Sequence, residues 1–302
     1  MLASLSPLTV GNHRFEWATR TYVMGILNVT PDSFSGDGIL ARGEAVPMAL
    51  EQARRFIEAG ADVLDVGGES TRPGSRPLDL DEERARVIPV IKALVAENPG
   101  VLLSVDTYKA AIAEEALAQG ARMINDVWAL RADPKLRGVI AGAECPVILM
   151  HNRSNPASVE VRAQLGNAYI GSEYKDLIGE VKRELMESVD VARTAGISDE
   201  HILLDPGVGF GKKVEQNLEL INRLDEIRAL GFPVLLGTSR KSFIGYTLDL
   251  PPDQRVEGTA ATVAVGIVRG ADIVRVHDVE AMARVAKMTD ALVRKTRPES
   301  RP

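Results

Sequence analysis

The chain contains little cysteine, few aromatic residues and no excess of positive charge. Its single cysteine, Cys145, excludes an internal disulfide, so we expect the protein to work in a reducing compartment, the cytoplasm. Cys145 also opens an apolar run at residues 146–150, which is typical of a buried hydrophobic residue rather than a nucleophile. A formal net charge of −6 supplies no basic field, so we expect no nucleic-acid partner and no anionic membrane partner.

Long uninterrupted apolar segments are also missing. The segment MLASLSPLTV at the start has neither a basic stretch nor a long apolar one, so we expect no signal peptide. The longest apolar region, residues 258–276, is interrupted by Arg269, Asp272 and Arg275, so we expect no membrane span. Because aromatic residues make up only 4% of the chain, the core must be aliphatic, which suits parallel strands buried on both faces.

The sequence does contain a repeated alternation of short apolar runs with segments of helical period. Eight runs predict strands, at residues 22–27, 63–66, 102–105, 123–125, 146–150, 202–204, 234–236 and 273–276. Helical segments lie between them, at 45–59, 80–97, 110–119, 173–195, 215–230 and 258–268, and a last helix is expected at 279–294. Eight such units in about 300 residues favour a closed (β/α)8 TIM barrel over an open sheet.

A small hairpin, formed by residues 8–10 and 14–17, is expected ahead of the main repeat. No low-complexity segment or linker breaks the series. We therefore expect one α/β domain over residues 1–302, with residues 1–20 as a hairpin extension.

The most informative stretch is DPGVGFGKK, from Asp205 to Lys213. The apolar run before it ends on an acidic residue, which is followed by a proline and three alternating glycines. Asp205 would therefore lie at the carboxyl end of a buried strand, where parallel α/β proteins keep their sites. The alternative is that Asp205 caps a helix that starts near Val214.

Polar or charged residues follow the other predicted strands in the same way. Strand by strand, these residues are Asn28, Glu69, Asp106, Asn125, His151, Lys241 and His277. Helix capping or turn formation explains any one of them, and that alternative stays open for Asp106, Asn125, Ser242 and His277. Capping explains less well why they would all lie at one rim of the barrel.

Seven motifs, in chain order, resemble the dihydropteroate synthases of folate biosynthesis: GILNVTPDSFS, GGESTRPGS, SVDTYKA, IND, DPGVGFGK, GTSRKSFIG and RVHDV. The resemblance runs from about Tyr22 to the last helix. It implies a barrel enzyme, a transferase, that condenses 7,8-dihydropterin-6-ylmethyl diphosphate with 4-aminobenzoate, giving 7,8-dihydropteroate and diphosphate, with Mg²⁺ assisting. It also implies a sulfonamide target and a homodimer that pairs through its later helices.

The chemistry of a pterin agrees with this resemblance. A pterin presents a donor-rich edge, and a carboxylate that accepts two parallel N–H bonds is its natural partner. The resemblance places the pterin-anchoring aspartate of the family at Asp205. Asp106 and Asn125 can meet the remaining ring donors and acceptors, and Lys241 can donate to ring acceptors. Met150 and Phe210 are expected to line the same pocket.

The leaving group requires cations. Departure of diphosphate leaves a cation delocalised into the pterin ring, so catalysis should consist mainly of stabilising separated charge. Arg275 and His277 lie two residues apart on one strand, and the resemblance implies that they bind phosphate oxygens. It also assigns Asn28 to Mg²⁺ through its amide oxygen.

The first two loops are expected to hold the second substrate. They contribute Asp32 and Phe34, and Thr71, Arg72 and Pro73, which together suit a flat benzoate. The resemblance implies that these loops fold over the site after diphosphate binds.

The expected catalytic set is Asp32, Arg72, Lys241, Arg275 and His277. The carboxylate of aminobenzoate would be received by Ser242 and nearby backbone N–H groups. We also assign Phe34, Phe210 and Phe243 to rim loops rather than to the core.

The chain departs from the family pattern in two places. After the fifth strand it has HNRSNP where most members read close to HMQG-x-P, and an insertion-like stretch follows at residues 157–172. The first loop has Ser35-Gly36-Asp37-Gly38 where the family usually has an aspartate followed by two glycines. His151 lacks the partnered spacing of a zinc site, so a structural role is favoured.

Two other functions stay open. A corrinoid-dependent methyltransferase acting on a methylated folate would share the barrel and the pterin floor, but it has no evident use for Arg275-x-His277 together with the two loops. A non-catalytic pterin-binding paralogue is the other alternative, and the intact set of catalytic candidates argues against it.

Overall fold

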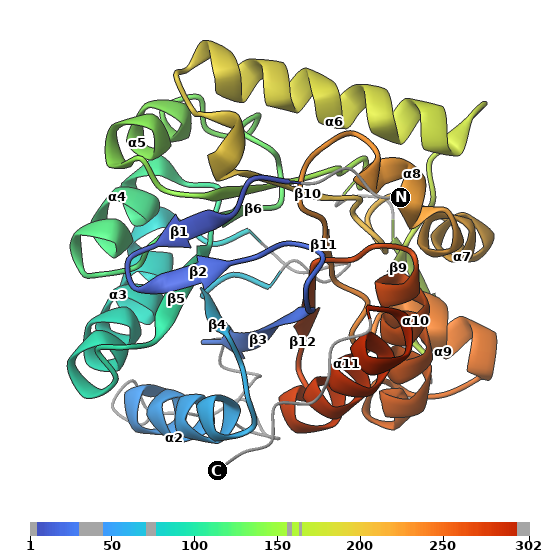
Figure 1. The fold of residues 1–302 in the computed structure, drawn as a ribbon, viewed down its shortest axis with the longest axis horizontal. Coiled ribbons are helices and arrows are strands. Elements are labelled where there is room, and N and C mark those ends of the chain that lie inside the picture. The colour runs from blue at the N-terminus through green and yellow to red at the C-terminus, as the bar shows by residue number, and fades with distance from the viewer. Residues whose placement is uncertain (1–4, 30–44, 71–76, 156–158, 163–164, 295–302) are drawn as a thin grey trace.

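The computed structural model describes residues 5–29, 45–70, 77–155, 159–162 and 165–294 and has the predicted barrel (Figure 1). One sheet of eight parallel strands has the order β10-β7-β6-β5-β4-β3-β12-β11. The strands are β3 (Tyr22–Asn28), β4 (Val63–Gly67), β5 (Leu102–Asp106), β6 (Met123–Asp126), β7 (Val147–Met150), β10 (Ile202–Asp205), β11 (Leu235–Leu236) and β12 (Ile273–Val276). A parallel bridge between Leu204 and Val234 joins the two edge strands and closes the sheet.

Helices follow the strands and surround the barrel (Figure 1). They are α2 (Ala45–Glu58), α3 (Leu80–Glu97), α4 (Ala110–Ala118), α5 (Leu136–Ala143), α6 (Leu177–Thr194), α7 (Val214–Asn222), α8 (Leu224–Arg228), α9 (Ser242–Leu248), α10 (Val256–Val268) and α11 (Val279–Val293), with short 3-10 turns η1 (Asp199–His201) and η2 (Pro252–Gln254). Within the described ranges, no helix is both long and apolar enough to cross a membrane.

Three helix predictions differ from the structure. The segment at 215–230 forms two helices, α7 and α8, because Arg223 leaves the helical conformation with φ −113° and ψ 25°. Helix α6 begins four residues later than predicted, since the side chain of Asp176 accepts the N–H of Gly179 at 3.1 Å and caps the helix. The short helices α5 and α9 were not predicted, and each has too few turns to show a clear period.

The lower half of the barrel interior is an apolar layer. One side chain from each strand faces inward near its amino end: Met24, Val63, Leu102, Met123, Ile148, Leu203, Leu235 and Ile273. The predicted hairpin, β1 (Leu8–Val10) and β2 (His13–Phe15), covers this end with its own apolar residues (Figure 1). Phe15 stacks on Trp17 with ring centroids 5.3 Å apart. Phe15, Trp17 and Tyr22 thus supply large side chains where the hairpin closes the barrel floor.

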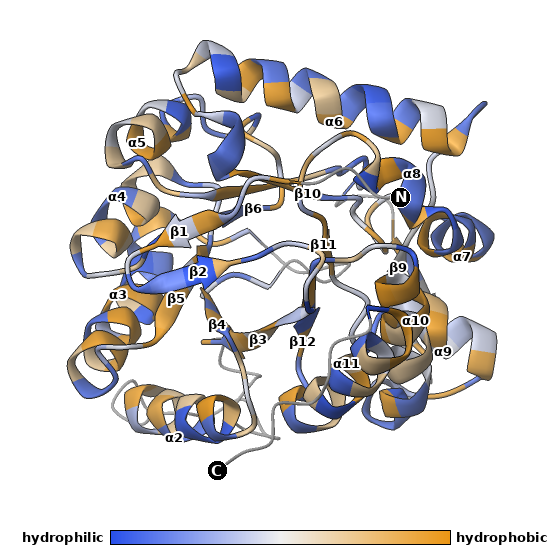
Figure 2. Ribbon diagram, in the orientation of Figure 1, coloured by the Kyte–Doolittle hydropathy of each residue, from blue (hydrophilic) through white to orange (hydrophobic). Residues whose placement is uncertain are grey.

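The outward-facing side chains of the strands pack against the helices. In β4, Leu64 and Val66 are fully buried in the cluster that includes Val87 and Ile91 of α3. The helices carry hydrophobic and hydrophilic residues in alternating bands (Figure 2). The strands are therefore buried on both faces, as the aliphatic composition predicts.

The insertion-like stretch forms a second antiparallel hairpin, β8 (Val159–Arg162) and β9 (Gly166–Tyr169). Arg255, which is only 2% exposed, donates Nη2 to the carbonyl of Leu165 at 2.7 Å and Nη1 to the carbonyl of Arg240 at 2.9 Å. The hairpin is therefore attached to the loop after β11, at the carboxyl rim of the barrel.

A buried ion pair fixes the seam at which the barrel closes. Arg228 of α8 donates Nε to Oδ2 of Asp272 at 2.6 Å, and the same oxygen accepts the backbone N–H of Val234 at 3.0 Å. The two side chains are 0% and 2% exposed. The pair thus connects a helix to the last two strands.

We predict that Asp272→Ala destabilises the protein by about 3–5 kcal/mol, because it leaves the guanidinium of Arg228 buried without its partner. Urea unfolding measures the change. Arg284→Ala is the matched control, since the pair between Arg284 and Glu280 is 76% and 69% exposed and should leave the unfolding midpoint nearly unchanged. Equal midpoints for the two variants would contradict the role given to the buried pair.

Candidate active site at the carboxyl rim of the barrel

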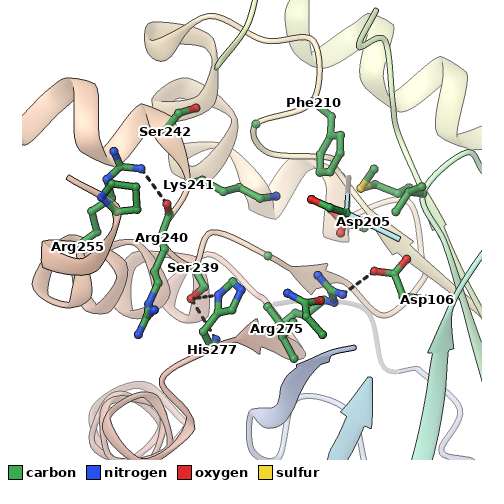
Figure 3. Close-up of a pocket in the computed structure, with 18 of the residues that line it drawn as sticks. Asp106, Asp205, Phe210, Ser239, Arg240, Lys241, Ser242, Arg255, Arg275 and His277 are labelled. Atoms are coloured by element: carbon green, nitrogen blue, oxygen red, sulfur yellow. Dashed lines mark hydrogen bonds and ion pairs between the residues drawn. The ribbon is translucent and has the colours of Figure 1, made fainter. Parts of the chain in front are cut away.

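The carboxyl ends of the strands open into one cavity of about 580 Å³ (Figure 3). Alternation along the strands supplies its polar floor: Leu203 of β10 faces the apolar layer, and two residues further on Asp205 faces the cavity. The same step of two residues leads from Met123 to Asn125 and from Ile273 to Arg275. The predicted site residues that line the cavity are Asn28, Asp106, Asn125, Met150, Asp205, Phe210, Lys241, Ser242, Arg275 and His277.

Five predicted site residues lie outside the described part of the chain. They are Asp32, Phe34, Thr71, Arg72 and Pro73, together with the departure at residues 35–38. Their roles stay predictions.

Asp205 is buried at the end of β10. Its Oδ1 accepts the backbone N–H of Gly207 at 2.7 Å, which forms a local turn and does not cap a helix. The N-cap residue of α7 is Lys213, so the capping alternative for Asp205 is wrong. Burial raises the pKa of Asp205, while the positive charge of Lys241 opposes that rise.

Arg275 is held between two carboxylates. Its Nε donates to Oδ2 of Asp65 at 2.6 Å, and its Nη2 donates to Oδ2 of Asp106 at 2.6 Å (Figure 3 shows the second contact). Asn125 donates Nδ2 to the same oxygen of Asp65 at 2.9 Å. Asn125 is therefore part of a buried ion-pair network rather than a turn.

Sequence reasoning missed Asp65. The predicted site residues follow the strands, whereas Asp65 lies inside an apolar run. The signal was present, because an acidic residue in the middle of the strand VLDVG is fully buried only if a partner meets its charge.

Asp106 and Lys241 have pKa values shifted toward neutrality. Burial raises the pKa of Asp106 to about 7, against the attraction of Arg275. Burial lowers the pKa of Lys241 to about 8, against the attraction of Asp205. The carboxylate of Asp106 does not cap α4, whose N-cap residue is Lys109. Opposed shifts of this kind in one cavity are typical of a functional site.

Lys241 and Phe210 face each other across the cavity rim (Figure 3). Nζ of Lys241 lies 4.7 Å from the ring centroid of Phe210 and donates to the carbonyl of Val208. Ser242 is the first residue of α9, not its N-cap, which is Lys241. Phe243 is 2% exposed and packs in the main core, so its assignment to the rim was wrong.

The glycine-rich loop after β10 is tied down by a buried lysine that sequence reasoning also missed. Nζ of Lys212 donates to the carbonyls of Gly207 at 2.8 Å and Phe210 at 3.1 Å. Gly207 has a φ of 69°, and a Cβ there would lie 1.7 Å from the carbonyl oxygen of His151, so only glycine fits. Burial lowers the pKa of Lys212 to about 7.

His151 has the structural role that was favoured for it. Its Nδ1 lies 3.0 Å from Nζ of Lys212, and its Nε2 lies 3.1 Å from Oε2 of Glu184. Burial lowers its pKa to about 4, so the ring is neutral at physiological pH. Cys145 is buried, and burial raises its pKa to about 11, which disfavours a nucleophilic thiolate.

His277 lies beside Ser239 at the rim (Figure 3). Its Nδ1 is 3.0 Å from Oγ of Ser239, and its backbone N–H donates to the same oxygen at 3.1 Å. The N-cap residue of α11 is Asp278, so His277 is not the cap.

The residues around Asn28 fit a hard cation such as Mg²⁺. Asn28, Gly67 and Asp106 lie opposite one another on neighbouring strands. A Cβ at Gly67 would lie 3.7 Å from Oδ1 of Asn28 and 3.6 Å from Oδ2 of Asp106, so both oxygens lie close to this glycine. Oδ2 of Asp106 already accepts from Arg275, whereas the amide oxygen of Asn28 is the type of ligand that Mg²⁺ prefers. In the described ranges, no group of three or more His, Cys, Asp or Glu side chains could hold a metal ion. An ion at Asn28 would need waters and substrate oxygens to complete its coordination.

Comparisons with known proteins agree with the geometry. The family model described as "Pterin binding enzyme" matches residues 24–277. The dihydropteroate synthase of Bacillus subtilis is 49% identical over 280 residues, which covers 93% of this chain and 91% of that protein.

Solved structures are similar as well. A Clostridium difficile dihydropteroate synthase crystallised in the presence of pteroic acid has a TM-score of 0.84 and 48% identity, and the match covers 93% of this chain and 99% of that one. A Xanthomonas albilineans dihydropteroate synthase with 4-aminobenzoic acid has a TM-score of 0.85 and 40% identity, with 97% and 99% covered. The chain therefore belongs to the pterin-binding enzymes and, among them, to the dihydropteroate synthase family.

Proposed function

We propose that this chain condenses 7,8-dihydropterin-6-ylmethyl diphosphate with 4-aminobenzoate to give 7,8-dihydropteroate and diphosphate. The observation that carries the proposal is the cavity floor, where four side chains that suit a pterin lie beside the arginine that a departing diphosphate requires. These five residues are Asp106, Asn125, Asp205, Lys241 and Arg275. Family membership supports the synthase over the methyltransferase alternative.

Asp205 would anchor the pterin. One lone pair of its Oδ1 is used by Gly207, which leaves Oδ2 and the remaining lone pairs to accept ring N–H donors. Lys241 would donate to a ring acceptor, and Met150 and Phe210 would contact the faces of the ring. Each charge-assisted bond is worth about 1.5–3 kcal/mol.

Arg275 and His277 would stabilise the departing diphosphate. Two N–H groups of Arg275 are occupied by Asp65 and Asp106, so the phosphate oxygens would be met by its remaining N–H groups. Fixing the guanidinium in this way places its charge before the bond breaks, which is the basis of electrostatic catalysis. Bound Mg²⁺, held through Asn28, would supply further positive charge to the diphosphate oxygens.

The aminobenzoate would enter beside Lys241 and Ser242, with its carboxylate toward Ser242 at the start of α9. The resemblance assigns Asp32, Phe34, Thr71, Arg72 and Pro73 to the rest of this pocket, and we keep that assignment as a proposal. A sulfonamide would compete for the same place.

We also propose that the chain pairs with a second copy through α10 and α11. These adjacent helices expose a group of apolar side chains: Val265 at 43%, Val268 at 57%, Met288 at 60% and Leu292 at 71%. An exposed apolar patch of this kind suits a symmetric interface. The single buried cysteine supports a cytoplasmic location, which cell fractionation would test.

For this interface, Val268→Glu together with Leu292→Glu should convert a dimer to a monomer in sedimentation equilibrium, because charges would be buried at its centre. Leu218→Glu, on the exposed face of α7 at 42%, is the control that should leave the mass unchanged. A monomeric parent protein would refute the pairing.

The reaction itself is tested by diphosphate release from the pterin diphosphate. We expect release to depend on 4-aminobenzoate and to fall on chelation of Mg²⁺. Arg275→Ala should lower turnover about ten- to a thousand-fold at saturating substrate, because contacts to charge that develops in the transition state are lost. Release without any condensed product, or an arginine variant as fast as the parent, would contradict the proposal.

Asp205→Asn tests pterin anchoring. The change replaces a buried acceptor by a donor that faces the ring N–H groups, so pterin binding should weaken by about 1–3 kcal/mol or more. Calorimetry with a pterin acid measures the effect, and the affinity for 4-aminobenzoate in the presence of pterin diphosphate is the reference. Unchanged pterin affinity would contradict the anchoring role, and Asp205 would then have only the structural role given by its hydrogen bond to Gly207.

A further inference from the structure

Asp65 is a buried carboxylate that is not among the residues lining the cavity. It lies beneath the floor, is 0% exposed, and projects inward two residues after Val63 of the apolar layer. All of its recorded hydrogen bonds go to two residues of the floor, Arg275 and Asn125, through Oδ2. Its Oδ1 has no partner among the described residues.

The contact with Asn125 decides which way the amide points. An ionised carboxylate can only accept, so the atom of Asn125 that faces Asp65 must be Nδ2, at 2.9 Å. The reverse orientation would place two acceptors against each other. The amide oxygen of Asn125 is therefore directed to a partner other than Asp65, and Asn125 lines the cavity.

The contact with Arg275 fixes the plane of the guanidinium. Asp65 accepts from Nε and Asp106 accepts from Nη2, each at 2.6 Å, so two different nitrogens of the same planar group are held. With only Asp106 as an anchor, the side chain could rotate about that single contact. Asp65 thus removes the remaining freedom of the arginine.

We propose that Asp65 is a positioning residue for pterin recognition: it presents the amide oxygen of Asn125 as an acceptor and holds Arg275 in place, without contacting the substrate. The proposal rests on the proposed function and deepens it. Asn125 can accept an N–H group of the ligand only while Asp65 holds its amide in this orientation. Asp65 and Asn125 together would therefore select a ligand that presents N–H donors.

Calorimetry with pterin-6-carboxylic acid tests the proposal directly. Asp65→Asn keeps the shape but replaces the carboxylate by a neutral amide, so the bond that orients Asn125 and the ion pair that holds Arg275 both weaken. We expect the affinity to fall about ten- to a hundredfold, as is common when a residue that supports a ligand contact is changed. Arg275 keeps Asp106 as a partner in this variant, which favours folding.

Ser104→Ala is the matched control. Ser104 lies opposite Asp65 on β5, is 0% exposed, and its Oγ has no partner among the described residues. The pterin affinity of the Ser104→Ala variant should stay within about twofold of that of the parent, because no hydrogen bond of the described residues is lost.

Asp65→Ser is a second variant for the case in which Asp65→Asn does not fold, because serine brings no new N–H group against Arg275. Its affinity should fall about tenfold.

Steady-state kinetics separates positioning from a general structural effect. The kcat/KM for the pterin diphosphate should fall while the KM for 4-aminobenzoate stays close to that of the parent. Equal losses for both substrates, or parental pterin affinity in the Asp65 variants, would overturn the proposal. If the parent protein binds the pterin acid but forms no dihydropteroate, the proposed function fails, and the binding comparison still decides the role of Asp65.

Discussion

The arrangement of the site depends on one constraint, the alternation of side chains along eight parallel strands that close on themselves. Alternate residues of each strand face the interior, so one layer of apolar side chains is followed, two residues on, by a polar layer. The lower layer is sealed by the β1–β2 hairpin, and the outward residues anchor the helices. The polar layer is therefore held by a rigid frame on all sides, which suits a site whose chemistry requires fixed charges.

Burying that many charges together has consequences for their ionisation. Asp106 and Asp205 line the cavity with Arg275 and Lys241, and Asp65 pairs with Arg275 from beneath the floor. Among these five side chains the carboxylates outnumber the cations before any ligand is bound. Burial and the neighbouring carboxylates raise the pKa of Asp106, while burial lowers that of Lys241. A ligand with N–H donors on one edge and a diphosphate on the other would complement both signs of charge.

The loops after β7 and β10 form a second supporting network beside the site. Lys212, His151 and Glu184 connect the glycine-rich loop to the end of β7 and to α6. The backbone N–H of His151 also donates to the carbonyl of Asp205 at 2.9 Å, which joins this network to the cavity floor. The family departure at HNRSNP falls in this network: Asn152 donates Nδ2 to the carbonyl of Val127 at 3.0 Å, and Arg153 pairs with Glu180 at 2.7 Å. The residues of the departure therefore support these loops, and Asp205 and Asn125 lie where the motifs predict them.

The sequence by itself determined the eight strands, the barrel fold and the strand ends that carry Asn28, Asp106, Asn125, Asp205, Lys241 and Arg275, because apolar period and strand ends are local properties of the chain. Tertiary structure alone decided the partners. In the sequence, Asp65 is an unexplained charge within an apolar strand. In the structure it pairs with Arg275, which lies 210 positions away. Nothing in the sequence distinguishes Lys212 from a solvated lysine, but in the structure its Nζ is buried against the carbonyls of its own loop. Phe243 follows a rim motif in the sequence, but α9 directs its side chain into the core. A residue's partner depends on which strands and loops become neighbours in space, and no periodicity in the sequence encodes that.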